Sequence, residues 1–171
     1  MKDLDEAKRI LGMEIERDWR SGKVSLTQKG YLQKVLQRFN IDGDTKFVST
    51  PLPPHFKLKA TMSPTTIEER EYMTRMPYAR AVGSLMYAMV CTRPDLSQVV
   101  FMISRCIHDP GKGYWKAVKW VLRYIKDTID IGLVFEKDST GKHECIRYVD
   151  SNYAGDLDKH RSTTRYVFTL S

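Results

Sequence analysis

The sequence predicts an α+β fold with an N-terminal β-hairpin, a central helical region and a C-terminal antiparallel sheet. Three observations predict it. Apolar and polar residues alternate near residue 15 and again over 24–27, which is typical of strands. Apolar residues recur every three or four positions in four segments between 28 and 127, which is typical of amphipathic helices. After residue 131 the period returns to two. Since helices are followed by strands, we expect two domains, 1–130 and 131–171.

The N-terminal elements are a hairpin and a helix. The hairpin is expected over 9–26, because a Ser-Gly pair lies between its two alternating segments. A helix is expected from Thr27 or Gln28 to about Asn40. Most of the prolines lie in 41–66, where no period is sustained, so this segment is expected to be long and irregular.

Three further helices and three strands are expected after this segment. The helices run from about Tyr78 to Cys91, from Pro94 to about His108, and from about Gly113 to Asp127, with Pro94 in a first helical turn. The strands are expected at 132–135, 145–149 and 166–170 and should form one antiparallel sheet.

Composition restricts the class of protein. The 171 residues carry 28 basic and 21 acidic side chains, and the net charge of +7 favours an acidic partner such as nucleic acid or an anionic membrane. Three cysteines without a Cys-x-x-Cys pair argue against a disulfide framework or a structural zinc site. The charged N-terminus is unlike a signal peptide, and Arg93-Pro94-Asp95 interrupts the longest apolar region. We therefore expect an intracellular protein, in the cytoplasm or nucleus, that is neither secreted nor bound to a membrane.

One predicted helix has a basic side. Residues 111–126 carry five basic residues and no acidic one, and the five fall within an arc of about 80°. Two tryptophans border this arc, and apolar residues lie opposite. Phosphates spaced along a backbone would relieve the repulsion among like charges, and the tryptophans could pack on sugar or base. The predicted nucleic-acid-binding residues are Lys112, Lys116, Lys119, Arg123, Lys126, Trp115 and Trp120.

Two alternatives to nucleic-acid binding stay open for the basic side of this helix. Lysine stripes are common on solvated helices, so the basic side could have no ligand. An anionic membrane is a weaker alternative, because Val118 and Val121 are expected to belong to a core rather than to face lipid.

The acidic residues give a weaker signal. Asp150 ends a predicted strand, and Asp156 and Asp158 follow it. Nuclease and polymerase chemistry needs several carboxylates to hold two Mg²⁺ ions, and one aspartate on a strand is as compatible with a turn or loop residue. The four histidines show no spacing typical of metal ligands.

Several segments, taken together, resemble the Pol polyprotein of copia-type LTR retrotransposons over essentially the whole chain. The first two, 10–15 and 25–31, resemble the hairpin at the end of the reverse transcriptase palm and the helix after it. Residues 77–87, 92–95 and 115–124 resemble the helical thumb and connection region. Residues 150–164 resemble the opening strands of the ribonuclease H domain. The resemblance thus implies a reverse transcriptase C-terminal part followed by an incomplete ribonuclease H-like sheet.

The resemblance also implies roles for particular residues. The residues that match the primer grip are Leu11, Gly12, Met13 and Glu14. Asp150 matches the first ribonuclease H carboxylate, a ligand of Mg²⁺ in the parent enzyme. The polymerase aspartates would precede Met1 and the other ribonuclease H carboxylates would follow Ser171. We therefore expect both active sites to be incomplete, and this chain to need no cofactor and to have no catalysis of its own.

The expected function is that of a truncated Pol product with a sequence-independent surface for the backbone of an RNA–DNA hybrid or another duplex. Two alternatives stay open: a co-opted, effector-like interaction protein, and residual ribonuclease H activity by complementation. The sequence does not indicate an oligomeric state.

Four residues depart from the family's usual pattern: Arg80, Asp127, Asn152 and Arg165. Arg165 replaces a glycine that is usual between two strands. If that position needs a positive φ, the arginine would cost about 1 kcal/mol or more.

Overall fold

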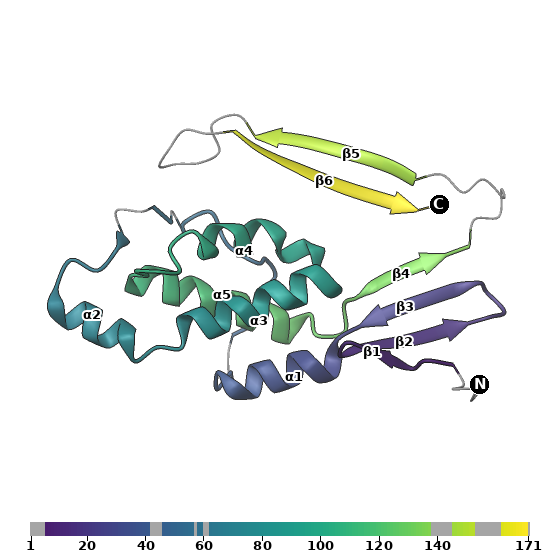
Figure 1. The fold of residues 1–171 in the computed structure, drawn as a ribbon, viewed down its shortest axis with the longest axis horizontal. Coiled ribbons are helices and arrows are strands. Elements are labelled where there is room, and N and C mark those ends of the chain that lie inside the picture. The colour runs from purple at the N-terminus through teal and green to yellow at the C-terminus, as the bar shows by residue number, and fades with distance from the viewer. Residues whose placement is uncertain are drawn as a thin grey trace, which may run out of the picture. The chain divides into compact units, whose positions relative to one another are not determined.

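The computed structural model describes residues 6–41, 46–56, 58–59, 62–137, 145–152 and 162–170. These residues form an α+β structure with an N-terminal antiparallel sheet and several helices (Figure 1). The chain divides into two compact units. One unit comprises Met1–Ile15 and Leu26–Leu133, and the other comprises Glu16–Ser25 and Val134–Ser171.

The N-terminal sheet contains the predicted hairpin. Strand β2 (Met13–Asp18) and strand β3 (Lys23–Thr27) form it, and a short strand β1 (Arg9–Ile10) pairs with β2 on the outside. The Asp18 carboxylate accepts hydrogen bonds from the Arg20 and Ser21 amides at 3.0 and 3.3 Å, which closes the hairpin turn. The predicted hairpin is confirmed.

The fourth strand of this sheet is a correction to the sequence prediction. Strand β4 (Leu133–Glu136) was expected to belong to the C-terminal sheet, but it pairs with β3. The Lys137 amide donates to the Gly22 carbonyl at 2.9 Å, and Lys23 forms an ion pair with Glu136 at 2.6 Å. Gly132 makes the pairing possible, because a Cβ there would lie 2.2 Å from the Leu26 carbonyl oxygen. The alternating pattern of β4 correctly predicted a strand, but it did not predict which strand would pair with it.

Four predicted helices are confirmed, with shifted ends. They are α1 (Lys29–Arg38), α3 (Tyr78–Cys91), α4 (Ser97–Ser104) and α5 (Lys112–Asp127). Pro94 opens a short 3₁₀ helix, η2 (Pro94–Leu96), before α4. Helix α4 ends at Ser104, earlier than predicted, because the chain then turns more tightly, with the Ile107 amide donating to the Ser104 carbonyl.

Helix α2 (Ile67–Thr74) was not predicted. The Thr66 hydroxyl accepts a hydrogen bond from the Glu69 amide at 3.2 Å and caps this helix. The sequence carried the signal, because Thr66 and Glu69 have the spacing of a capping box.

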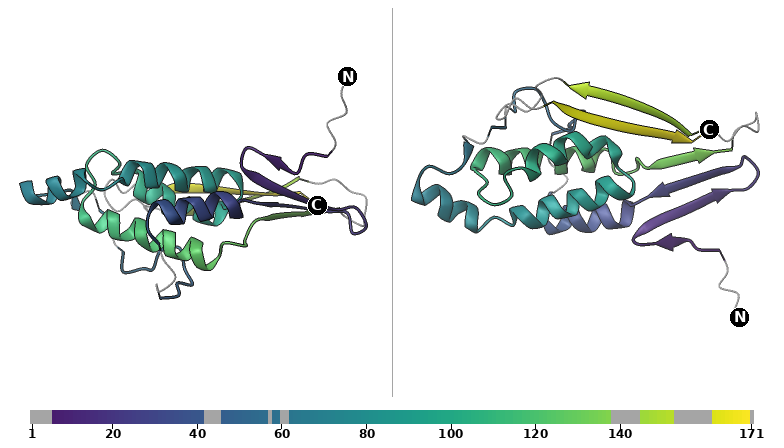
Figure 2. Two further views of the ribbon diagram at one scale, coloured as in Figure 1. Left: turned by 90° about the horizontal axis from the view of Figure 1, so that it is seen from below. Right: turned by 45° about the horizontal axis from the view of Figure 1, so that its top comes forward.

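The hydrophobic core lies among the helices, and α5 is its central element. Helix α5 packs against α1, α3 and α4 (Figures 1 and 2). Its inward side is fully buried over two turns, and so are the α3 residues that face the core. The buried residues of α5 are Tyr114, Trp115, Ala117, Val118, Val121, Leu122, Tyr124 and Ile125.

In the other unit, strand β5 (Cys145–Asn152) and strand β6 (Thr163–Leu170) form an antiparallel pair, with Cys145 opposite Leu170 and Asn152 opposite Thr163. Every side chain of this pair that the structure describes is exposed.

The strain predicted for Arg165 does not arise. Arg165 lies within β6 opposite Asp150. Among the described residues other than glycine, only Leu11 and Asn40 have a positive φ. The chain extends through position 165 instead of turning there, so an arginine fits the backbone.

No helix in the described part of the chain is long and apolar enough to cross a membrane.

Candidate nucleic-acid interface

Helix α5 presents one charged side and one buried side, as the sequence indicated. We call Lys112, Lys116, Lys119, Arg123 and Lys126 the basic face. Its first three residues are exposed and its last two are half-buried. The opposite side of α5 is fully buried. Because the buried side of α5 fixes the rotation of the helix about its axis, the basic face always points away from the core.

Most charges of the basic face have no acidic partner. In the described residues, no carboxylate lies within 4.0 Å of the charged atoms of Lys112, Lys116, Lys119 or Arg123. Like charges three or four residues apart on a helix repel by tenths of a kcal/mol per pair. The basic face thus holds a local excess of positive charge that a polyanion would relieve.

Aromatic rings position three of these cations. The Lys112 ammonium lies 5.3 Å from the centre of the Tyr72 ring on α2, and the Lys119 ammonium lies 5.7 Å from the Trp115 ring. The Arg123 guanidinium lies 5.1 Å from the Trp120 ring. Such contacts limit side-chain freedom, so less conformational entropy is lost when a ligand binds.

Trp115 does not have the role that the sequence predicted. Its side chain is 6% exposed and packs edge-on against Tyr78, with ring centres 6.5 Å apart. A ring this buried offers no open face to a base. Trp115 lies at the border between the buried side and the basic face of the helix. The helical period alone does not predict whether a residue at this border is buried or exposed, and in the structure Trp115 packs into the core.

Trp120 is half-buried and already has protein contacts. Its indole N–H donates to the Thr50 carbonyl at 3.0 Å. Its ring lies 5.8 Å from the ring of Phe56 and 6.0 Å from that of His55. Trp120 therefore joins α5 to the segment 46–56, a contact that the sequence did not indicate.

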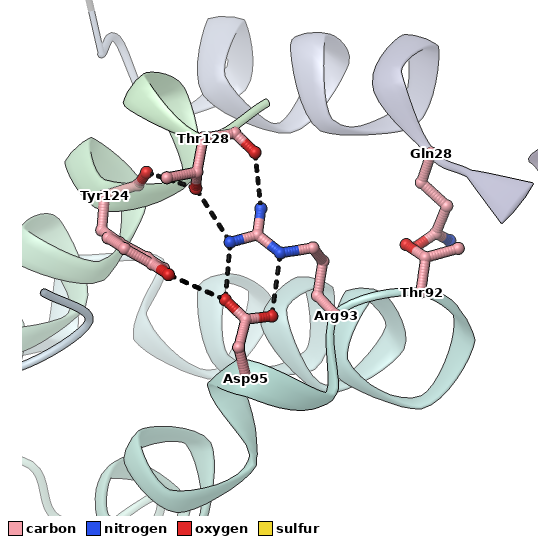
Figure 3. A network of polar contacts seen from close by, with 6 residues as sticks. All are labelled: Gln28, Thr92, Arg93, Asp95, Tyr124 and Thr128. Atoms are coloured by element: carbon pink, nitrogen blue, oxygen red, sulfur yellow. Dashed lines mark hydrogen bonds and ion pairs between the residues drawn. The ribbon is translucent and has the colours of Figure 1, made fainter. Parts of the chain in front are cut away.

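A buried arginine fixes the end of α5 (Figure 3). Arg93 is fully buried, and its guanidinium forms two hydrogen bonds with the Asp95 carboxylate, at 2.9 and 2.8 Å. It also donates to the backbone carbonyl and the hydroxyl of Thr128, at 3.0 and 2.8 Å. The Tyr124 hydroxyl donates to Asp95 at 3.0 Å. This network ties the start of η2 to the last turn of α5 and so holds the basic face in place.

The network also sets the ionisation of Asp95. Burial alone would raise the pKa of Asp95, but the Arg93 guanidinium, together with the Tyr124 hydroxyl and a backbone hydrogen bond, keeps this pKa below its ordinary value. Burial, followed by the hydrogen bond to the Asp95 carboxylate, raises the pKa of Tyr124. Both effects favour the charged Arg93–Asp95 pair with a neutral tyrosine beside it. The sequence predicted only a helix boundary at this position.

A second buried pair lies beside the network. The Thr92 hydroxyl donates to the Gln28 side-chain oxygen at 2.9 Å, and both residues are buried. The pair joins the N-terminal end of α1 to the end of α3 (Figure 3). The Gln28 side-chain nitrogen has no hydrogen-bond partner among the described residues.

The primer-grip-like residues form a tight turn between β1 and β2. Leu11 and Gly12 both have positive φ, 50° and 74°, and Ile10 pairs with Met13, which defines a two-residue turn of the I′ kind. The Leu11 carbonyl accepts a short hydrogen bond from the Tyr87 hydroxyl on α3. The Leu11 side chain is 75% exposed.

The next residues of this segment anchor it. Met13 and Glu14 are half-buried. The Glu14 carboxylate accepts a hydrogen bond from the Gly30 amide at 3.3 Å and lies 3.6 Å from the Arg9 guanidinium. The turn is thus fixed to α1 and α3, while its apolar tip remains exposed.

Asp150, the predicted ribonuclease H carboxylate, is exposed on β5. The described residues contain no group of three histidine, cysteine, aspartate or glutamate side chains that could hold a metal ion. Asp156 and Asp158 lie outside the described residues. Because Mg²⁺ needs several oxygen ligands, Asp150 and its described neighbours do not fit the ion.

Asp127 is one of the residues at which this sequence departs from the usual family pattern, and its side chain makes a hydrogen bond that joins α5 to another segment. It ends α5, and its carboxylate accepts a hydrogen bond from the Val48 amide at 2.8 Å. Arg80, another such position, is exposed on α3, and Asn152 ends β5. At position 127, therefore, the unusual residue has a hydrogen-bonding role.

This α+β chain, which carries a basic helix face over its core, has clear relatives. It is 49% identical over 172 residues to "Retrovirus-related Pol polyprotein from transposon TNT 1-94" of Nicotiana tabacum, an alignment that covers all of this chain and 13% of the relative. It is 32% identical over 170 residues to the Pol polyprotein from transposon RE1 of Arabidopsis thaliana, covering 99% of this chain and 11% of the relative. The homologues of this chain thus include retrovirus-related Pol polyproteins from plant transposons, and the chain spans 13% and 11% of the length of these two relatives.

A relative with a different printed name is "Secreted RxLR effector protein 161" of Plasmopara viticola. It is 43% identical over 99 residues, which cover 58% of this chain and 68% of the relative. No family model matches the chain, and no solved structure matches it.

Proposed function

We propose that this chain is the part of a Pol polyprotein that joins the end of the reverse transcriptase, residues 1–130, to the first strands of the ribonuclease H domain, residues 131–171. In this proposal the basic face binds the backbone of an RNA–DNA hybrid or another nucleic-acid duplex. The chain would act in the cytoplasm or nucleus as a binding element without catalysis of its own.

The observation that carries the proposal is the positive charge of Lys112, Lys116, Lys119 and Arg123, which have no carboxylate partner among the described residues and lie on a helix held rigid by its core. Lys112 and Arg123 lie eleven positions apart on α5, a distance of about 16 Å along the axis. A nucleic-acid strand rises about 3.4 Å per nucleotide, so the basic face can follow several successive phosphates. Lysine and arginine contacts to phosphate position a duplex without reading its sequence.

Binding should be measured with the whole chain and an RNA–DNA hybrid at low salt. The test variant is Lys116→Glu, Lys119→Glu and Arg123→Glu together. The control is Lys34→Glu, Arg38→Glu and Arg75→Glu, which makes the same change in net charge at exposed positions on α1 and after α2. We expect the test variant to lose binding and the control to keep most of it.

The salt dependence of hybrid binding is an independent test of the proposal. For the unmodified chain, the logarithm of affinity should fall with the logarithm of salt concentration with a slope of roughly three to five, about one per neutralised phosphate. Unchanged binding by the test variant would show that the basic face is only solvated. Equal losses in both variants would show that net charge, and no particular face, attracts the nucleic acid.

A second candidate is a non-catalytic interaction protein, favoured by the similarity to a protein named as a secreted effector. Capture of a protein partner that survives nuclease treatment and the basic-face substitutions would support it. Residual ribonuclease H activity by complementation is a weaker candidate, because Asp150 belongs to no group of three possible metal ligands in the described residues. Mg²⁺-dependent hybrid cleavage that Asp150→Asn abolishes would establish it.

A further inference from the structure

An aromatic cluster adjoins the basic face where the sequence predicted only an irregular segment. His55, Phe56 and Trp120 form it. The His55 and Phe56 rings are 4.7 Å apart and tilted by 31°, close to an offset stack. The Trp120 ring meets the His55 ring at 90°, with centres 6.0 Å apart.

The cluster is held in a defined position. The Phe56 amide donates to the Pro53 carbonyl at 3.1 Å, so residues 53–56 form a turn with Pro54 at its first central position. The Phe56 side chain packs against the core, and Trp120 is fixed through its hydrogen bond to the Thr50 carbonyl. His55, at the second central position of the turn, is exposed. The turn therefore presents one ring to solvent with its aromatic neighbours beneath it.

The cluster and the basic face share a boundary. Arg123 belongs to the basic face, and its guanidinium lies over Trp120 of the cluster. Lys116 lies one helical turn before Trp120 on α5. A strand whose phosphates follow the basic face would thus bring its next nucleotides to His55.

We propose that His55, Phe56 and Trp120 form a stacking platform for an unpaired base of single-stranded nucleic acid that continues from a duplex on the basic face. The platform rests on the proposed function, because the basic face must hold the adjoining strand. The charge beside it favours a nucleic acid over an apolar ligand, and the ring faces suit any base, since every base has a π-face. Sequence preference is therefore not expected.

The test compares two RNA–DNA hybrids of the same duplex length. One is blunt, and the other carries a single-stranded extension of about four nucleotides, close to the smallest site on a single-strand-binding surface. Stacking of one base should give about a fivefold preference for the extended hybrid. The preference should persist as salt rises, whereas the affinity for both hybrids falls, because stacking releases few counterions.

The variants identify the ring responsible. His55→Ala should remove the preference, while the affinity for the blunt hybrid stays close to that of the unmodified chain. Phe47→Ala is the matched control, because Phe47 is 74% exposed in the same segment and has no ring contact among the described residues. A fluorescent adenine analogue in the extension should be quenched on binding to the unmodified chain and to Phe47→Ala, but not to His55→Ala.

Two results would overturn the platform: equal affinity of the unmodified chain for both hybrids, or a preference that His55→Ala retains. Failure of the proposed function looks different, because the blunt hybrid would then bind equally well to the basic-face variant Lys116→Glu, Lys119→Glu and Arg123→Glu.

Discussion

Arg93 shows how a single buried residue can join the start of one helix, η2, to the end of another, α5. A fully buried guanidinium is costly unless its hydrogen bonds and its charge are satisfied. Asp95 supplies the charge, and Thr128 supplies the remaining acceptors from the end of α5. Replacing one partner therefore affects both helices at once.

We expect Asp95→Asn to lower the free energy of unfolding at neutral pH by about 3 kcal/mol, because Arg93 stays buried without its counter-charge. Since the folded pKa of Asp95 lies below its unfolded value, this stabilisation is present above about pH 4 and is lost as pH falls through the lowered pKa. The difference between the two chains should therefore shrink in acid. Urea unfolding over a pH series measures it.

Asp130→Asn is the control for this prediction, because the Lys29–Asp130 pair is exposed on both sides. It should leave the free energy of unfolding nearly unchanged at neutral pH. A difference between Asp95→Asn and the unmodified chain that does not vary with pH would contradict the role given to the carboxylate charge.

Leu11 carries backbone strain at an exposed position. A branched residue in the left-handed region costs about 1 kcal/mol, whereas Asn-Gly is a favoured pair for this type of turn. We expect Leu11→Asn to raise the free energy of unfolding by about 0.5–1 kcal/mol, with little loss of burial. If the exposed leucine contacts nucleic acid, as its match to the primer grip implies, the same substitution should weaken hybrid binding.

Urea unfolding and hybrid binding of the same Leu11→Asn preparation test the two parts separately. Gly12→Ala is the opposing control and should destabilise the turn, because it places a Cβ at a φ of 74°. A less stable Leu11→Asn chain would show that the Leu11 side chain is needed for packing.

At the scale of elements, local pattern predicted conformation well and partners poorly. The 3.6-residue period located α1, α3, α4 and α5, and the alternation located the strands. The partners of β4 and Trp115 were not predictable, because they depend on contacts between residues far apart in sequence. The network around Arg93 was hidden for the same reason, since Thr128 is 35 positions away. Of the candidate site, the basic face could be predicted, but neither the burial of Trp115 nor the proximity of His55 could.

The end of α5 offers a test of one such long-range contact. Asp127→Gly should lower the free energy of unfolding by about 1–2 kcal/mol, because the amide of the buried Val48 loses its acceptor. Asp127→Asn keeps an acceptor oxygen and should cost less. Thermal unfolding of the two variants distinguishes these effects. If the loss of charge were the cause, both variants would lose the same stability, whereas loss of the hydrogen bond should destabilise Asp127→Gly more.

At the scale of the whole molecule, burial is concentrated in one part of the chain. Every buried hydrophobic residue among those described lies between Leu32 and Ile125. The β5–β6 pair has exposed side chains on both faces wherever they are described. A two-stranded sheet whose hydrophobic side chains stay exposed is marginal in water, and its unpaired edges invite association.

The helical part should therefore keep its stability when β5 and β6 are removed. A chain ending at Lys137 retains the core and β4, so its helical circular dichroism signal should melt within about 4 °C of the full chain, a shift that corresponds to less than about 1 kcal/mol. A chain ending at Asp130 should melt lower, because it loses β4 and leaves β3 with an open edge. Hydrogen exchange in the full chain should be slowest in α3 and α5 and fast in β5 and β6. A large drop in melting temperature for the chain ending at Lys137 would show that β5 and β6 stabilise the helical core.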